Sequence, residues 1–229
     1  MILDDSNDSP DTLERVHTSR GELCLRRVAG RFEIISNGVF LMDTADGTSE
    51  RLLVEAAVER CDAPQPRVLI GGLGVGFSLN RAVRFARVAA IDVVEIEPAI
   101  IGWHARYLQE ITGAAMCDPR VTIHEADVID WLARSPDRYD VVCLDTDNGP
   151  NWLVFDGNAD LYHAPGLDRA HSCLHTGGVL AVWSASRDDA FEDRLRVRFG
   201  LVEIVQTPHH RGSPDIVYLA RRRPERAST

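Results

Sequence analysis

The chain has 229 residues, of which 45% are hydrophobic and 26% are charged, so it is long enough for one sizeable globular domain with a small appendage. Its formal net charge of −10 argues against a nucleic-acid or anionic-membrane partner. Its five cysteines are widely spaced and form no CxxC pair, which argues against a zinc knot or a disulfide framework, and we expect no metal site.

The N-terminal region begins with an acidic stretch, residues 1–12, which we expect to be a disordered tail. It has no apolar signal core, and no apolar run in the chain approaches transmembrane length, so we expect a cytoplasmic, reduced protein. Residues 13–45 alternate polar and apolar side chains between glycine turns, a pattern typical of strands. The Asn37-Gly38 pair predicts a hairpin turn within this small antiparallel β unit.

Residues 46–222 change to alternating helix and strand patterns. A helix is expected to begin at Thr48 or Ser49, with Glu50 in its first turn. Strands that alternate with helices predict an α/β domain with a mostly parallel sheet covered on both faces. The last two strands predict an antiparallel hairpin at one edge, and residues 223–229 are expected to be a tail.

Helical patterns separate the expected strands. One of them opens with Pro98 in its first turn, where proline is tolerated because the N–H that it lacks would have no partner there. These patterns predict helices over 77–86, 98–111 and 128–135, and near 165–175.

Glycines gather directly after the first strand of the α/β region, at Gly71, Gly72, Gly74 and Gly76. Open α/β sheets bind ligands at the carboxyl ends of their strands. Glycines there let the backbone approach a ligand closely, because no Cβ stands in the way. A tight strand–helix turn without a ligand is the alternative interpretation.

Acidic residues end the next two strands. Glu95 follows the glycines by about twenty residues, where an acid can accept hydrogen bonds from both ribose hydroxyls. Asp127 ends the third strand and can accept from an adenine amino group. The Gly72-x-Gly74-x-Gly76 spacing fits the dinucleotide fingerprint less well. Together these strand ends predict the Rossmann-like fold of class I S-adenosylmethionine (SAM) enzymes, with SAM or a relative of it as cosubstrate.

Two aspartates, Asp145 and Asp147, follow the apolar fourth strand. Placing carboxylates at the end of such a strand costs free energy. One of them can accept the proton that an amine nucleophile loses. Capping of a turn through Asn148-Gly149 is the structural alternative.

From about residue 31 to 222, the sequence resembles the spermidine synthase family, the polyamine aminopropyltransferases. The segments "GGLGVG", "VEIEP", "DPRVTIHEAD" and "YDVVCLDTDNGP" carry the resemblance. It implies a ribose-binding role for Glu95, an adenine-binding role for Asp127 and a proton-accepting role for Asp145. Across a one-residue gap, it implies an amine-binding role for Asp147. A homodimer is expected by family analogy alone.

The sequence departs from that family around the amine. Gly74 stands where the family has the acid that holds the amine of decarboxylated SAM. The family's glutamine in the N-terminal hairpin falls on Leu41, its tyrosine in the next helix on Glu50 and its glutamine after the fifth strand on Trp183. Gly74 favours full SAM as donor, and hence a methyltransferase acting on an amine or other small nucleophile, while the other departures favour an acceptor other than simply putrescine. The alternatives are aminopropyl transfer from decarboxylated SAM to an altered acceptor, and a non-catalytic nucleoside-binding module.

Further side chains are candidates for contact with the acceptor. The segment from Asn148 to His163 is long enough to form a lid. Trp183 can form an apolar or cation–π wall. The alternatives are ordinary packing for the aromatic residues and surface exposure for the histidines; His104 is assigned no role. The candidates on the lid and in the last hairpin are Trp152, Phe155, Tyr162, His209 and His210.

Overall fold

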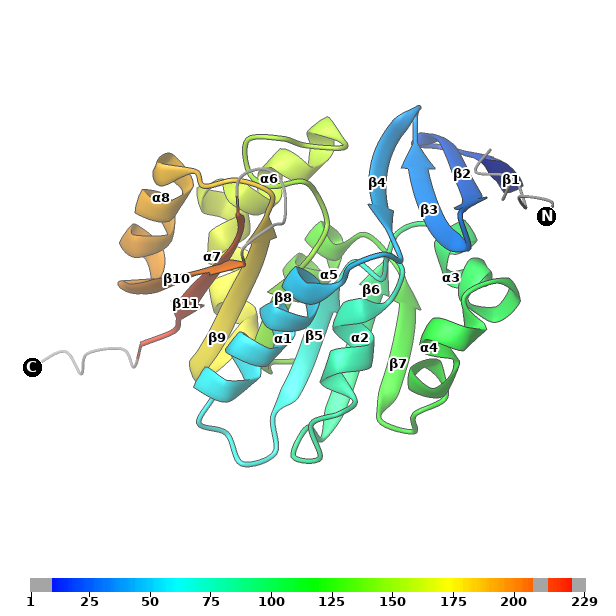
Figure 1. Cartoon of the computed structure of the whole chain (residues 1–229). Coiled ribbons are helices and arrows are strands. Elements are labelled where there is room, and N and C mark those ends of the chain that lie inside the picture. The colour runs from blue at the N-terminus through cyan, green and yellow to red at the C-terminus, as the bar shows by residue number, and fades with distance from the viewer. Residues whose placement is uncertain (1–9, 208–213, 224–229) are drawn as a thin grey trace, which may run out of the picture. The chain divides into compact units, whose positions relative to one another are not determined.

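The structure, a computed structural model, describes residues 10–207 and 214–223. Contacts divide the chain after Gly47, two residues beyond the boundary expected at residue 45. The smaller unit is an antiparallel sheet with strand order β1-β2-β3-β4 (Figure 1). Its strands are β1 (Asp11–Thr18), β2 (Gly21–Val28), β3 (Arg31–Ser36) and β4 (Val39–Asp43).

The hairpin between β3 and β4 turns at Asn37-Gly38, as the sequence predicted. Both residues have positive φ angles, of 50° and 80°, which a tight two-residue turn requires. The Asn37 side chain also accepts a hydrogen bond from the Glu22 N–H at 2.9 Å, which ties the turn to β2. Asp11 pairs with Arg27 of β2, so part of the segment expected to be a disordered tail belongs to the sheet.

The larger unit is built on a sheet with strand order β10-β11-β9-β8-β5-β6-β7. Neighbouring strands from β9 to β7 run parallel, whereas β11 runs antiparallel to both β9 and β10. The predicted α/β fold, with its mostly parallel sheet and antiparallel C-terminal hairpin, is therefore confirmed. The strands are β5 (Arg67–Gly71), β6 (Ala90–Glu95), β7 (Val121–Glu125), β8 (Tyr139–Leu144), β9 (Leu174–Ser184), β10 (Leu201–Thr207) and β11 (Asp215–Arg221).

Helices cover both faces of this sheet (Figure 1). Helices α1 and α2 pack together on one face, where α4 contacts α2, and α7 contacts both α5 and α8 on the other face. No described helix combines the length and the apolar character that a membrane span needs. The helices are α1 (Thr48–Arg60), α2 (Phe77–Ala82), α3 (Pro98–Arg106), α4 (Gln109–Met116), α5 (Val128–Arg134), α6 (Ala159–Tyr162), α7 (Ala164–Cys173) and α8 (Asp189–Phe199), with a 3₁₀ turn η1 (Asp156–Asn158).

Two helices differ from the sequence predictions. The single helix expected over 98–111 is broken, because the Trp103 carbonyl accepts from both the Tyr107 and the Leu108 N–H groups and α3 ends there. Helix α8 was not predicted at all, although Asp188 caps it by accepting from the Phe191 N–H at 3.0 Å. The buried residues Phe191, Leu195 and Phe199 recur every four residues, as in a helix. The many charged residues between them made this helical pattern hard to recognise in the sequence.

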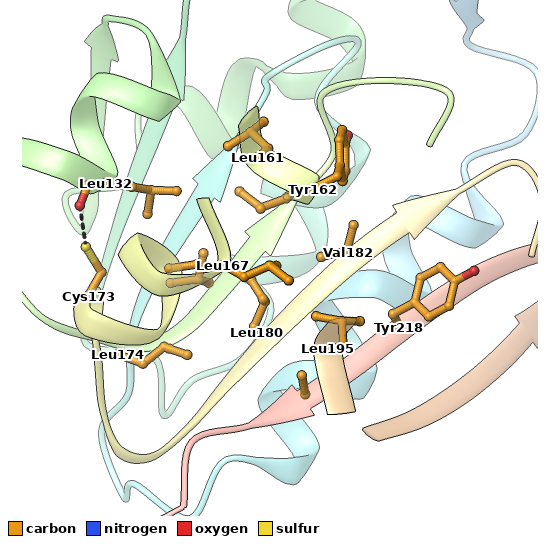
Figure 2. Packing of buried hydrophobic residues seen from close by; sticks show 14 of the residues in the cluster. Leu132, Leu161, Tyr162, Leu167, Cys173, Leu174, Leu180, Val182, Leu195 and Tyr218 are labelled. Carbon is orange, nitrogen blue, oxygen red and sulfur yellow. Dashed lines mark hydrogen bonds between the residues drawn. The ribbon is translucent and has the colours of Figure 1, made fainter. Parts of the chain in front are cut away.

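The core between the sheet and helices α5 to α8 is a cluster of buried apolar side chains (Figure 2). Each fully buried leucine in it contributes roughly 1.5–3 kcal/mol to folding. Cys173 behaves as a small core residue whose thiol donates to the Leu132 carbonyl at 3.0 Å (Figure 2). Tyr162 belongs to this cluster, so the core holds the far end of the segment that follows β8.

Candidate functional site

The candidate site lies where the direction of the sheet order reverses. From β5 the chain proceeds outward through β6 and β7, and then returns to β8 on the other side of β5. Ligands of open α/β sheets bind beyond the carboxyl ends of the strands at such a switch point. The glycine loop follows β5 there, and Asp145 follows β8.

The glycine loop has a backbone that other residues cannot adopt easily. Gly72, Gly74 and Gly76 have φ angles of 94°, 50° and 88°. A Cβ on Gly72 would lie 2.1 Å from the Asp145 carbonyl oxygen, so glycine is needed for the ends of β5 and β8 to meet. A Cβ on Gly76 would lie 2.2 Å from the Thr112 Cγ2 atom. The loop is thus packed closely on both sides.

Glu95 ends β6 and fixes the glycine loop. Its Oε2 atom accepts from the Leu73 N–H at 2.9 Å, and its Oε1 atom accepts from the Glu97 N–H at 2.8 Å. Burial raises the pKa of the Glu95 carboxyl, and these N–H groups oppose the rise. A carboxylate has about four lone-pair positions, of which the Leu73, Glu97 and Ile96 N–H groups take three, so one is left for a ribose hydroxyl. The residue fits the predicted ribose-binding role, which stays a prediction.

Asp127 caps helix α5, because its Oδ1 atom accepts from the Ile129 N–H at 2.7 Å. This bond holds the carboxylate at the carboxyl end of β7, two strands from the switch point. A capping carboxylate keeps further lone pairs for a second donor. Its predicted contact with an adenine amino group is compatible with the cap and stays a prediction.

Asp145 lies at the end of β8, and its own N–H donates to the Gly71 carbonyl at 2.9 Å. The Ser78 hydroxyl lies 3.3 Å from Asp145 Oδ2 and 3.2 Å from the Glu50 carbonyl oxygen, so it can donate to either. Burial raises the pKa of the Asp145 carboxyl to about 7, and the neighbouring carboxylates of Glu50 and Asp215 add to the rise. A carboxylate with such a pKa takes up a proton readily at neutral pH.

Glu50 and Asp215 join Asp145 from elements far away in sequence. Burial raises the pKa of the Glu50 carboxyl in the first turn of α1. Asp215 is the first residue of β11 and is only 4% exposed. Because β11 runs against its neighbour β9, its first residue lies at the edge where β9 ends. Sequence reasoning gave neither residue a role, because the predicted C-terminal hairpin does not show which of its two strands lies beside β9.

Asp147 organises the segment after β8. Its carboxylate is buried and accepts from the Val154 N–H at 2.8 Å and from the Tyr162 hydroxyl at 3.2 Å. These bonds fasten the middle and the end of the expected lid. Asp147 therefore has a structural role, though through Val154 and Tyr162 and not through the expected turn at Asn148-Gly149, and its predicted contact with an acceptor cation stays a prediction.

The side chains on the expected lid that were predicted to contact the acceptor differ in how far they are exposed. Tyr162 is 2% exposed and packs edge-on against Phe191, so its ring belongs to the core. Trp152 and Phe155 of the same segment are 57% and 41% exposed, and neither belongs to the core cluster.

Trp183 is half-buried on β9, directly opposite Val217. Its Nε1 atom is buried without a hydrogen-bond partner among the residues that the structure describes. The predicted His209 and His210 lie outside the described residues. Among the described aromatic residues predicted to contact the acceptor, Trp183 is the one that lies near the carboxyl end of a sheet strand.

His104 on α3 is a residue of the site that sequence reasoning missed. It is 1% exposed, its Nε2 atom lies 2.9 Å from the Gly74 carbonyl oxygen, and its Nδ1 atom lies 2.6 Å from the Thr112 hydroxyl. Burial lowers the pKa of its imidazole. The sequence signal was a polar ring on an apolar helix beside Trp103, but no pattern says which loop such a ring contacts.

Comparisons with known proteins show the family of the chain. Residues 50–189 match the spermine/spermidine synthase domain family. The chain belongs to that family. A curated polyamine aminopropyltransferase of Prochlorococcus marinus (strain MIT 9301) is 35% identical over 94 residues, which are 41% of this chain and 33% of that relative. The matched part thus spans only a third of the relative's length.

Solved structures share the fold of this spermine/spermidine synthase family member at low sequence identity. A spermidine synthase in complex with the transition state analogue AdoDATO matches with a TM-score of 0.77 at 15% identity, over 92% of this chain and 73% of that one. Human methyltransferase-like protein 13 in complex with SAH matches with a TM-score of 0.62 at 21% identity, over 79% of this chain and 85% of that one. The two likenesses support the fold.

Proposed function

We propose that this chain transfers an aminopropyl group from decarboxylated SAM to an amine acceptor. The observation that carries the proposal is the placement of Asp145 at the switch point, with a pKa raised to about 7, in a member of the spermine/spermidine synthase family. In the reaction the carbon–sulfur bond of the donor breaks and a carbon–nitrogen bond forms. Methylthioadenosine leaves with the bonding electron pair, and Asp145 takes the proton from the amine.

The proton-accepting step is the part that the protein must supply, because a bound sulfonium donor is already activated by its positive charge. A free alkylamine has a pKa of about 10.4, so freeing its lone pair at pH 7 costs roughly 4–5 kcal/mol. A carboxylate within hydrogen-bond reach of the nitrogen lowers this cost by accepting the proton. Asp145 has the raised pKa suited to this task.

The donor would be held at the ends of β5, β6 and β7. Gly72 and Gly74 keep part of their surface exposed, and the exposed atoms of a glycine are backbone atoms. We assign a ribose hydroxyl to Glu95 and the adenine amino group to Asp127, in agreement with their free lone pairs. Both contacts are to the nucleoside part of the donor, which is the same in decarboxylated SAM and in SAM.

The acceptor would approach from the side of α1 and β11, where Glu50 and Asp215 add negative charge beside Asp145. Such a surrounding attracts a cationic amine and stabilises the ammonium product. Trp183 lies at the end of β9 next to β11 and can face the carbon chain of the acceptor. An amine is therefore the acceptor class that this charge distribution favours.

Methyl transfer from full SAM is the second candidate. Gly74 stands where the family resemblance expects an acid that binds the amine of decarboxylated SAM. Glycine at that position places no negative charge opposite the carboxylate of full SAM. Gly74 is therefore the observation that favours methyl transfer as an alternative to aminopropyl transfer.

Product analysis separates the two functions. The protein is incubated with a pool of amines and either decarboxylated SAM or SAM, and the remaining nucleoside is identified by mass spectrometry. Methylthioadenosine from decarboxylated SAM, with an amine that gains an aminopropyl group, supports the proposal. S-adenosylhomocysteine from SAM supports methyl transfer instead, and methylthioadenosine from full SAM indicates aminocarboxypropyl transfer or cyclisation. Binding of either donor without turnover would favour the non-catalytic module.

A further inference from the structure

The glycine loop is held by hydrogen bonds from the sheet and by a bond from His104 on α3. Two tethers come from β6: the Gly72 N–H donates to the Val94 carbonyl at 2.9 Å, and the Leu73 N–H donates to Glu95. Gly74 is instead held through its carbonyl oxygen, 2.9 Å from His104 Nε2. The loop between β5 and α2 is therefore held from the sheet at its start and from α3 at its middle.

The hydrogen-bond pattern fixes the tautomer of the ring. A carbonyl oxygen can only accept, so Nε2 must carry the proton that it donates to Gly74. In the neutral ring Nδ1 then accepts from the Thr112 hydroxyl, 2.6 Å away, which lies farther, at 3.2 Å, from its other possible acceptor, the Leu108 carbonyl. Thr112 in turn belongs to α4, which Asn80 of α2 ties down by donating to the Ile111 carbonyl at 2.6 Å. The ring is thus locked at both nitrogens.

The orientation of the Gly74 peptide matters because it is part of what the loop exposes. Leu73, Val75 and Gly76 are buried, whereas Gly72 and Gly74 keep exposed backbone. A glycine with a φ angle of 50° can rotate to many other conformations at little steric cost. Without the bond to His104, the Gly74 carbonyl is free to turn toward the exposed side of the loop.

We infer that His104 is a positioning residue for the nucleoside donor, because its Nε2–H bond holds the Gly74 carbonyl away from the exposed side of the glycine loop. The inference rests on the proposed function, in which the glycine loop binds the sulfonium nucleoside. His104 itself is 1% exposed and acts only through the loop.

Two substitutions at position 104 separate the two ring nitrogens. The amide nitrogen of glutamine can take the place of Nε2 and donate to Gly74, so His104→Gln is expected to keep the donor dissociation constant within about threefold of the native value. The amide nitrogen of asparagine takes the place of Nδ1 and cannot reach Gly74. His104→Asn is therefore expected to weaken donor binding by about 5–150-fold, the range for a buried carbonyl that loses its partner.

Thr112→Val is the matched structural control. It removes the partner of Nδ1 and leaves the bond between Nε2 and Gly74 in place, so it is expected to lower the melting temperature without weakening donor binding. Calorimetry with SAM and with decarboxylated SAM gives the affinities, and thermal melts give the stabilities. The turnover rate at saturating donor is expected to change less than the donor KM in His104→Asn.

Hydrogen exchange in the protein without a donor gives a readout that does not depend on the reaction. His104→Asn is expected to speed exchange in the peptide that contains residues 72–76, and His104→Gln is not. The inference is overturned if His104→Asn binds donor as the native chain does, or if affinity follows melting temperature across all three variants. If the native chain binds neither donor, the proposed function is overturned. If the native chain binds a donor and His104→Asn binds it equally well, this inference alone is overturned.

Discussion

The carboxylates at the carboxyl ends of the strands have different surroundings in the two halves of the large sheet. On the side of β6 and β7, Glu95 and Asp127 accept hydrogen bonds from backbone N–H groups. On the side of β8 and β11, the carboxylates of Glu50 and Asp215 raise the pKa of Asp145. The first half ties its acids to backbone N–H groups, whereas in the second half Asp145 has a pKa of about 7 and can take up a proton.

This difference matches the two tasks of the transferase that we propose. A group that recognises a ligand works best when it is pre-organised, since no conformational freedom is then lost on binding. A group that accepts a proton needs a pKa near the working pH, which burial and like charges provide. The half that is electrostatically unfavourable is therefore the half to which we assign the chemistry.

The largest expected effect comes from removing the proton acceptor. Asp145→Asn keeps the shape of the side chain and is expected to lower the turnover rate by about 10²–10⁴, the range for a lost general base. The affinity for the donor should change little, because the donor is assigned to the other half. Steady-state kinetics and calorimetry measure the two quantities, with Asp156→Asn on the exposed η1 turn as control. A loss of turnover below threefold would remove Asp145 from the mechanism.

The next largest effect is expected in the pre-organised half. Glu95→Ala removes the acceptor of the Leu73 and Glu97 N–H groups together with the proposed ribose contact, and is expected to weaken donor binding by about 10–100-fold. Calorimetry measures the loss. Glu125→Ala, at the exposed end of the neighbouring strand, removes the same charge without these bonds and should bind donor normally. Equal effects of the two substitutions would mean that net charge, and not the fixed carboxylate, governs binding.

A smaller effect is expected from the segment that follows β8. Asp147→Ala leaves the Val154 N–H and the Tyr162 hydroxyl without their acceptor, which should cost about 1–3 kcal/mol of folding free energy. Urea unfolding measures this loss, with the exposed Asp160→Ala as control. If Asp147 also binds the acceptor amine, the KM for amine rises in conditions where the variant is fully folded. An unchanged KM restricts Asp147 to its structural role.

The smallest effect is a shift in pH dependence. Asp145 must be ionised to accept a proton, so activity should fall on the acid side with a midpoint near its pKa of about 7. Glu50→Gln removes a negative neighbour that raises this pKa, so the midpoint should move to lower pH. The pH dependence of kcat/KM measures the shift, with the exposed Glu59→Gln on the same helix as control. A midpoint that stays in place, or moves to higher pH, contradicts the electrostatic coupling.

The sequence predicted the parts of the site that depend on local pattern. Alternating strands and helices indicated the parallel sheet, and glycines and acids at consecutive strand ends located the switch point with Gly72, Glu95 and Asp145. Such features could be predicted because parallel strands all end at one edge of their sheet. The break between α3 and α4 could not, because a shared carbonyl at Trp103 leaves no mark in the hydrophobic period.

The residues that the sequence did not assign meet only in three dimensions. Asp215 reaches the site because β11 runs against β9, and His104 reaches the glycine loop because α3 packs beside it. By itself, then, the sequence determined the fold class and the strand ends that carry its acids. The tertiary structure decided which of those acids are tied to N–H groups and which crowd one another, because hydrogen bonds and charge repulsion depend on distances between elements that periodicity does not record.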